Sequence, residues 1–357
     1  MGPLAGLRVV EISGIGPISY AGQMLADLGA EVTRIDRPGA TLEDWGASPV
    51  LDRGRRSLRV DLKDPAGVQR VLGLVAAADA LIEGFRPGVM ERLGLGPEQC
   101  LARNPALAYG RMTGWGQDGP YAQTAGHDIT YLAISGALHM IGEEGGKPVP
   151  PVNLLGDFGA GSTFLAFGVV CAILHARATG EGQVVDAAIV DGAASLTGLL
   201  HGFLRSGGWR DERGVNLLDG GAPFYDTYRC ADGGWVAVGA LEPQFYRELL
   251  EKLGLADVPA LAGDHHDPRV WPQLRERLTA KFAERDRDEW AALFAGADAC
   301  VAPVLSMLEA TTDAHNRARG NFVEIGGVVQ PAPVPRFSVT APELPSPAPD
   351  PGADQHT

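Results

Sequence analysis

The sequence has little of what marks secreted, metal-binding or nucleic-acid-binding proteins. It has only four cysteines in 357 residues, and 30 lysines and arginines against 44 aspartates and glutamates, which gives a formal net charge of −14. That charge opposes binding to nucleic acid and to anionic membranes. The cysteines lie far apart and form no Cys-x-x-Cys pair, which indicates buried free thiols rather than disulfides or a metal site. They are Cys100, Cys171, Cys230 and Cys300.

Long hydrophobic runs and export signals are also lacking. The longest apolar run, residues 158–174, is interrupted by glycine, serine and threonine, and it is shorter than the ~20 residues that span a bilayer. We interpret it as a buried helix. Residues 1–4 contain no basic segment followed by an apolar one, so nothing marks the chain for export. We expect a cytoplasmic protein with no membrane partner.

What is present is the composition of a globular enzyme, with 45% hydrophobic and 21% charged residues. Apolar periodicity predicts strands at residues 7–12, 30–35, 80–83, 109–112 and 182–188, with helices at 19–28, 65–78 and 162–177 between them. Strands that alternate with helices indicate a parallel sheet. The fold class is therefore α/β, with a large, mostly parallel, Rossmann-like α/β domain.

The second half of the chain predicts a smaller α+β domain. It has a strand pattern at residues 234–239, helices at 244–253, 271–282 and 287–294, and extended structure at 302–305. We expect a large domain at 1–190, linker helices and a loop at 191–225, and the small domain at 226–320. A proline-rich arm at 321–345 then returns to the large domain, and a tail at 346–357 is expected to be disordered.

The turn after the first strand invites comparison with dinucleotide-binding proteins. Gly14 and Gly16 match two glycines of the fingerprint, but the third position is Ser19, and Pro17 removes a backbone N–H where a pyrophosphate needs donors. The pattern argues against a nicotinamide-dependent oxidoreductase.

Two titratable side chains stand among small and apolar residues. His127 follows Ala125-Gly126, and Asp157 lies within Leu155-Gly156-Asp157-Phe158-Gly159. Imidazole exchanges a proton near neutral pH, and a carboxyl group in a poorly hydrated site has its pKa raised toward that range. Two such groups on opposite faces of one carbon are able to invert it. A nearby helix N-terminus would oppose the rise at Asp157, so the sequence leaves its protonation state open.

A local group of basic residues is unusual in this acidic chain: Arg53, Arg55, Arg56, Arg59 and Lys63. Guanidinium groups suit phosphates, but charge runs are also common on solvated surfaces. The sequence leaves both interpretations open.

Several segments together resemble the family-III CoA-transferase superfamily (CaiB/BaiF type) over nearly the whole chain. They are residues 6–11, 27–32, 34–38 and 83–88. Within that superfamily the α-methylacyl-CoA racemases are the most similar, on Gly126-His127-Asp128-Ile129 with Tyr131, Asn153, Asp157 and residues 242–246. In the transferases the carboxylate at the Asp157 position accepts the acyl group and then CoA, and the histidine position is usually filled otherwise.

The resemblance implies racemisation of 2-methylacyl-CoA thioesters through a planar enolate. His127 and Asp157 would be the two acid/base groups, with backbone N–H groups near Asp128 stabilising the enolate oxygen. Asn153 would hold the thioester or Asp157. Glu242 would orient His127 from the partner subunit of an interlocked homodimer.

The resemblance also implies a set of CoA-binding residues. They are Arg37, Val60, Asp61, Leu62, Lys63, Gly84, Phe85, Arg86, Arg92, Gly126 and Tyr131. No separate cofactor and no metal is expected, because CoA is part of the substrate. The alternatives are a CoA-transferase that uses Asp157 as the nucleophile and a non-catalytic acyl-CoA-binding protein, which would need neither His127 nor Glu242. The sequence does not specify the acyl group.

Overall fold

The computed structural model describes residues 2–41, 43–44, 48–258, 261 and 263–355, and it divides into two compact units. Unit 1 comprises residues 1–137, 151–197 and 314–357, and unit 2 comprises residues 138–150 and 198–313. Both halves of the chain therefore contribute to unit 1. The limits expected from the sequence differ from these units in three places. Residues 138–150 belong to unit 2, residues 314–320 belong to unit 1, and the expected linker at 191–225 is divided between the units after residue 197.

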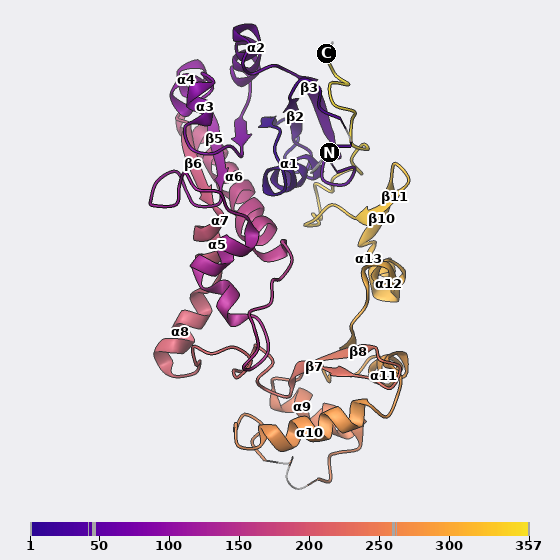
Figure 1. Cartoon of the computed structure of the whole chain (residues 1–357). Helices are drawn as coiled ribbons and strands as arrows, with labels where there is room; N and C mark the ends of the chain where they lie inside the picture. The colour runs from indigo at the N-terminus through magenta and orange to yellow at the C-terminus, as the bar shows by residue number, and fades with distance from the viewer. Residues whose placement is uncertain (1, 42, 45–47, 259–260, 262, 356–357) are drawn as a thin grey trace. The chain divides into compact units, whose positions relative to one another are not determined.

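The described residues of unit 1 form a six-stranded parallel sheet, which confirms the predicted α/β class. The strands are β1 (Arg8–Ile12), β2 (Glu31–Asp36), β3 (Arg55–Arg59), β4 (Ala80–Glu83), β5 (Ala108–Thr113) and β6 (Gln183–Ala188). Their spatial order is β3-β2-β1-β4-β5-β6 (Figure 1). This is the Rossmann order. Successive strands are added on one side of β1 up to β3 and on the other side from β4 onward, so the order reverses between β1 and β4 while all strands stay parallel. Ligands of such sheets bind at the carboxyl ends of the strands beside that point.

Helices cover both faces of this sheet. On one face, α2 (Pro65–Val75), α3 (Val89–Arg92) and α4 (Pro97–Arg103) pack on a cluster that includes Ile12, Leu81 and Tyr109. The other face contacts α1 (Pro17–Asp27) and α6 (Thr163–Thr179). The side chain of Asp64 accepts a hydrogen bond from the N–H of Ala66, so α2 has the predicted N-cap ahead of a proline in its first turn.

Four further helical segments belong to unit 1. They are α5 (Asp128–Ser135), the π-helix η2 (Leu154–Ser162), α7 (Ile189–Leu196) and α13 (Ala314–Arg319). A hairpin of β10 (Phe322–Ile325) and β11 (Val328–Pro331) follows α13, and the short 3-10 helix η1 (Ala137–Met140) lies where the chain leaves unit 1.

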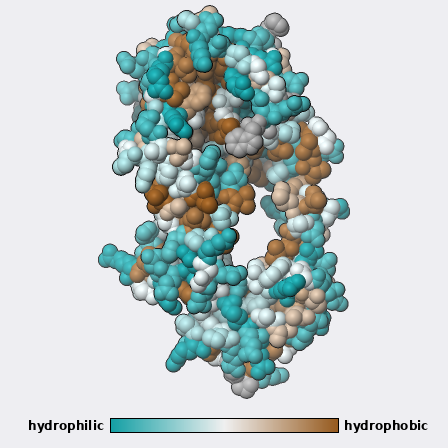
Figure 2. Space-filling model, viewed as in Figure 1, coloured by the Kyte–Doolittle hydropathy of each residue, from teal (hydrophilic) through white to brown (hydrophobic). Residues whose placement is uncertain are grey.

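The apolar run interpreted as a buried helix is longer and more exposed than predicted. Helical structure continues from Leu154 to Thr179, and by length and composition alone this helix is able to cross a membrane. In the structure, 44% of its most apolar window is buried. Phe167 and Leu174 are 70% and 63% exposed, and Figure 2 shows hydrophobic residues gathered at the surface. Cys171 of this helix and Cys300 are exposed, contrary to the prediction of buried thiols, whereas Cys100 and Cys230 are buried.

The predicted basic group at residues 53–63 is divided by the fold. Arg55 lies in β3 with its guanidinium fully buried and pairs with Glu11 at 2.8 Å. Arg53 is 1% exposed and pairs with Asp27 at 2.6 Å. Neither arginine is therefore available to bind an anion at the surface, because each guanidinium forms an ion pair with a buried carboxylate. Arg56 and Arg59 remain exposed on β3.

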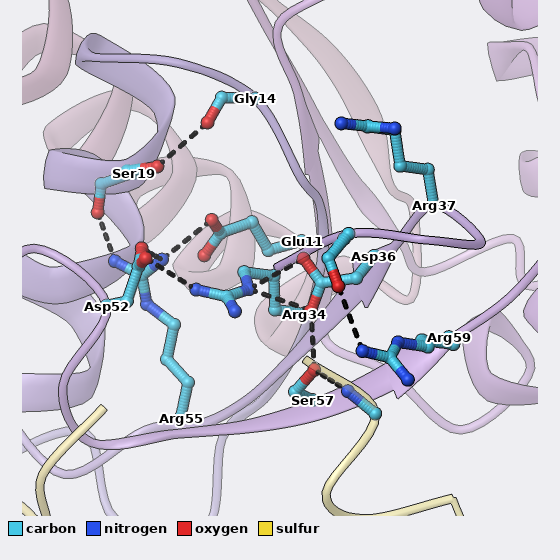
Figure 3. Close-up of polar contacts among 12 residues, drawn as sticks. Glu11, Gly14, Ser19, Arg34, Asp36, Arg37, Asp52, Arg55, Ser57 and Arg59 are labelled. Atoms are coloured by element: carbon cyan, nitrogen blue, oxygen red, sulfur yellow. Dashed lines mark hydrogen bonds and ion pairs between the residues drawn. The ribbon is translucent and has the colours of Figure 1, made fainter. Parts of the chain in front are cut away.

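Figure 3 shows the network to which Arg55 belongs, between the sheet and α1. Arg34 bridges Asp52 at 2.9 Å and Asp36 at 3.1 Å. Burial raises the pKa of Glu11 to about 7 against the opposing effect of Arg55.

Unit 2 is the smaller α+β body that the sequence predicts. Its antiparallel sheet contains β7 (Tyr225–Arg229), β8 (Trp235–Gly239) and β9 (Val301–Pro303). The helices are α8 (Gly198–Ser206), α9 (Pro243–Leu253), α10 (Trp271–Phe282), α11 (Arg287–Phe294) and α12 (Met307–Thr312). Phe224, Phe282 and Trp290 are fully buried in its core.

The C-terminal tail differs from the expected disordered segment as far as it is described. From Ser346 to Gln355 it makes hydrogen bonds to Gly54, Ser57 and Arg59 at the edge of the sheet. Paired backbone groups at an otherwise open sheet edge give this proline-rich segment a fixed path.

Candidate active site

The candidate site lies at the carboxyl edge of the sheet, beside the point where the strand order reverses. Gly16 caps α1 directly after the β1 turn with φ +70°. A side chain at this position would place its Cβ 3.6 Å from Oδ2 of Asp157. The turn after β4 approaches the same helix, because a Cβ at Gly84 would lie 3.4 Å from Ile18. The carboxylate of Asp157 therefore faces the crevice that this strand order creates.

Asp157 is presented by η2, which is a π-helix and not the start of α6. π-Helices are rare and are frequently found at functional sites. The backbone N–H of Asp157 donates to Oδ2 of Asp128 at 2.7 Å, and that of Gly156 donates to the same carboxylate. A Cβ at Gly156 would lie 2.3 Å from Oδ2 of Asp128, so this contact requires glycine. Buried Asp128 thus fixes the backbone that carries Asp157.

The surroundings of Asp157 raise its pKa to about 6. Burial is the largest cause, and the negative charge of Asp128 adds to it. A hydrogen bond from Asn153 and the imidazole of His127 act in the opposite direction. Desolvation therefore outweighs the stabilisation of the anion, and the carboxyl group exchanges its proton near neutral pH.

His127 is the N-cap of α5 and has extended backbone dihedrals. Its backbone N–H donates to Oγ1 of Thr130 at 3.0 Å, which fixes the start of the helix. The side chain of His127 is exposed, whereas the next residue, Asp128, is buried. The fold thus brings His127, Asp128, Asn153 and Asp157 together within unit 1.

Tyr131 closes one side of this group. Its ring is buried and meets Trp115 edge to face, with centroids 4.8 Å apart. A Cβ at Gly114 or Gly126 would overlap this ring, at 2.0 Å and 2.5 Å. Burial, followed by the charge of Asp157, raises the pKa of Tyr131 to about 12, so its hydroxyl group stays protonated.

Most of the predicted CoA-binding residues directly follow β2, β3 and β4 at the same edge. Arg37 follows β2, residues 60–63 follow β3, and residues 84–86 follow β4. Leu62, Lys63 and Arg92 line one cavity of about 500 Å³. Arg37 is exposed and its guanidinium lies 2.8 Å from Asp44.

The side chains of two predicted CoA-binding residues, Val60 and Asp61, make contacts within the protein. Val60 is 5% exposed and packs in the core of the sheet, so its side chain is not available to a ligand. The carboxylate of Asp61 accepts the N–H of Lys63 at 2.9 Å and thereby shapes the turn.

Glu242 belongs to unit 2, unlike the other four predicted catalytic residues. It is the exposed N-cap of α9.

Among the residues that the structure describes, no group of three histidine, cysteine or acidic side chains is arranged to hold a metal ion.

Sequence reasoning missed an ion-pair triad that supports this edge, in which Glu83 and Arg111 are buried and Glu91 is exposed. Glu83 ends β4 at 0% exposure, and its carboxylate accepts the N–H of Phe85 at 2.7 Å and Nε of Arg111 at 3.0 Å. Arg111 also pairs with Glu91 at 2.8 Å. Burial raises the pKa of Glu83 to about 7. The available signal was a glutamate at the end of an apolar strand.

The comparisons with known proteins agree with this geometry. Residues 4–357 match the family model described as CoA-transferase family III. The chain belongs to CoA-transferase family III. This family member is 46% identical to a mouse protein named alpha-methylacyl-CoA racemase, over 99% of this chain and 91% of the mouse protein. Its identity to the human protein of that name is 44%, with the same coverage.

The fold of this family III chain is also found in solved structures. A CaiB/BaiF family protein from Brucella suis superimposes with a TM-score of 0.85 at 26% identity, covering 99% of this chain and 97% of that one. The match confirms the predicted family resemblance and fold for nearly the whole chain.

Proposed function

We propose that this protein is an isomerase that racemises 2-methylacyl-CoA thioesters by 1,1-proton transfer. The observation that carries the proposal is the partly buried Asp157, whose pKa is raised to about 6, in the same group as His127 at the carboxyl edge of the sheet. The identity of 46% to a protein named alpha-methylacyl-CoA racemase supports this class of substrate.

In the proposed mechanism, His127 and Asp157 flank the α-carbon. One group removes the α-proton from one enantiomer while the other, protonated, returns a proton to the opposite face, and the roles exchange in the reverse direction. Both steps pass through one enolate. The N–H groups of Asp128 and Ile129 at the start of α5 stabilise its oxygen, since the first N–H groups of a helix have no acceptor within it.

Two further residues orient the acid/base pair. The hydrogen bond from Asn153 holds the carboxylate of Asp157 and favours its ionised form. Glu242 of the partner subunit would orient His127, which requires a homodimer.

CoA would lie along the strand ends with Lys63 and Arg92 near its phosphates, because both line the 500 Å³ cavity. We propose no separate cofactor and a cytoplasmic location.

The deciding experiment is incubation with one enantiomer of a 2-methylacyl-CoA in D₂O without any acceptor acid. NMR follows α-deuterium incorporation and configuration. Exchange with inversion supports the racemase. Absence of exchange in folded protein contradicts it.

The raised pKa of Asp157 predicts the pH dependence. For the enantiomer whose α-proton Asp157 removes, kcat/KM should increase with pH through an apparent pKa of about 6, because only the carboxylate acts as a base. Asn153→Ala removes an interaction that lowers this pKa, so its profile should shift to higher pH. A profile identical to that of the wild type would contradict the assignment.

A CoA-transferase is the second candidate, and the description of the matched family favours it. Asp157 would then attack the thioester carbonyl, release CoA as a thiolate and form a mixed anhydride. The thiolate would next attack the Asp157 carbonyl of that anhydride, which releases the first acid and leaves an aspartyl-CoA thioester. A second carboxylate would attack this thioester to form a new mixed anhydride, and the released thiolate would attack its acyl carbonyl, which gives the new acyl-CoA and frees the Asp157 carboxylate. Transfer to an added carboxylic acid, with no α-exchange in its absence, would establish this activity.

A further inference from the structure

Asp354 and Gln355 take the place of a seventh strand along β3. Ser57 exchanges two hydrogen bonds with Asp354, since its N–H donates to Oδ2 at 2.8 Å and its carbonyl accepts the N–H of Asp354 at 3.0 Å. Arg59 does the same with the side-chain amide of Gln355, at 2.9 Å and 3.1 Å. Figure 1 shows the yellow tail beside β3. The tail thus satisfies outward-facing backbone groups of β3 from Ser57 to Arg59.

The tail also reaches inward to the end of β2. The N–H of Gly352 donates to Oγ of Ser57 at 2.7 Å, and that hydroxyl donates to Asp36. Figure 3 shows this chain of contacts continuing from Asp36 to Arg34. Asp36 immediately precedes Arg37, which is one of the predicted CoA-binding residues.

On its other side the tail holds α2. The carbonyl of Gln355 accepts a hydrogen bond from Arg70 at 3.0 Å. Arg70 lies on α2, and Arg59 ends β3, so one residue of the tail joins both elements that flank the turn at residues 60–64. That turn contributes Leu62 and Lys63 to the 500 Å³ cavity.

We propose that residues 350–355 are a positioning segment for CoA, which holds the β3–α2 turn in the conformation that receives the ligand. The inference rests on the proposed function. A turn already fixed loses less conformational freedom on binding, so the segment increases affinity without contacting the ligand. The described tail makes no contact with Asp157 or His127, so the chemical step does not depend on it.

The test compares three variants with the wild type: removal of all residues after Pro349, Gln355→Ala and Gly352→Ala. Gln355→Ala removes the side-chain amide that pairs with Arg59. Gly352 has φ +79°, and a Cβ there would lie 2.8 Å from Arg59, so alanine displaces the tail. Ser346→Ala is the matched control, because the hydrogen bond of Ser346 with Gly54 is made by the backbone carbonyl, which alanine keeps.

Calorimetry with free CoA and steady-state kinetics supply the readouts. The truncation should weaken CoA binding and raise KM roughly tenfold, which is about 1.4 kcal/mol, with kcat within about twofold of the wild type. The two point variants should shift Kd and KM in the same direction, and Ser346→Ala should match the wild type. A synthetic peptide of residues 350–357, which are the residues removed, should restore the affinity when added to the truncated enzyme.

Two results would overturn the inference. One is an unchanged Kd in a folded truncated protein and in Gln355→Ala. The other is a reduced kcat at unchanged KM, which would assign the tail to the chemical step. Failure of the wild type itself to bind CoA is a separate outcome, because it contradicts the proposed function and is observed before any variant is made.

Discussion

Asp157→Asn is expected to reduce α-proton exchange by ~10²–10⁴-fold, which is the usual contribution of a positioned acid or base. The amide neither removes nor returns a proton, while its size and its neighbours are retained. The loss should be greater for the enantiomer whose proton Asp157 removes, and His127→Ala should show the reverse preference. Deuterium incorporation measured separately from each enantiomer gives both ratios.

The stability of Asp157→Asn separates loss of chemistry from misfolding. The folded-state pKa of about 6 is above the ordinary value of 3.8. The contribution of Asp157 to stability is therefore fully present below pH 3.8 and is lost as the pH rises through 6. Above pH 7 the asparagine variant avoids this loss, so its Tm should exceed that of the wild type.

Glu98→Gln, which alters an exposed carboxyl group in the first turn of α4, is the control and should change neither activity nor Tm appreciably. Full retention of exchange in both Asp157→Asn and His127→Ala would contradict the two-base mechanism.

Arg55→Met is expected to lower the free energy of unfolding by about 3–5 kcal/mol, as is usual when one partner of a buried ion pair is removed. Glu11 would remain at 0% exposure without its cation. The interaction with Arg55 lowers the pKa of Glu11, so its loss raises that pKa above the present value of about 7. The folded protein then binds a proton that the unfolded chain releases near pH 4.5, and the deficit should grow as the pH rises.

Urea unfolding at pH 5 and pH 8 measures this deficit. Arg56→Met is the matched control, because Arg56 is the exposed neighbour of Arg55 in β3, and it should cost little. Adding Glu11→Gln to Arg55→Met should recover part of the loss. An equal effect of the Arg55 and Arg56 substitutions would contradict the assignment of a buried pair.

Most of the sheet was predictable from sequence, because β1, β2, β4, β5 and β6 carry apolar residues in strand patterns between turn residues. β3 was not, since Arg55-Arg56-Ser57-Leu58-Arg59 has the polarity of a surface segment. Its burial depends on Glu11, which lies 44 residues earlier in the chain. Local composition does not carry that information.

The candidate site also has features that the sequence predicts and features that it does not. His127 and Asp157 were predictable because titratable groups stand out among small apolar residues. The π-helical turn and the contact from Asp128 to the backbone of Asp157 were not, because both depend on segments 29 residues apart. The proline-rich tail was predicted from composition alone, which does not reveal that its amide groups match the edge of β3.

Arg53 binds residues that are synthesised much later than Arg53 itself, which delays completion of its contacts during translation. Its guanidinium donates to Oε1 of Gln330, 277 residues later, and to the carbonyl of Pro331. At ordinary translation rates of ~5–20 residues per second, the N-terminal strands leave the ribosome roughly 15–55 seconds before these acceptors exist. The sheet edge at β3 is therefore completed only after residues 330 and 331 have been synthesised, and a chain that terminates before them retains a cation with half of its acceptors missing.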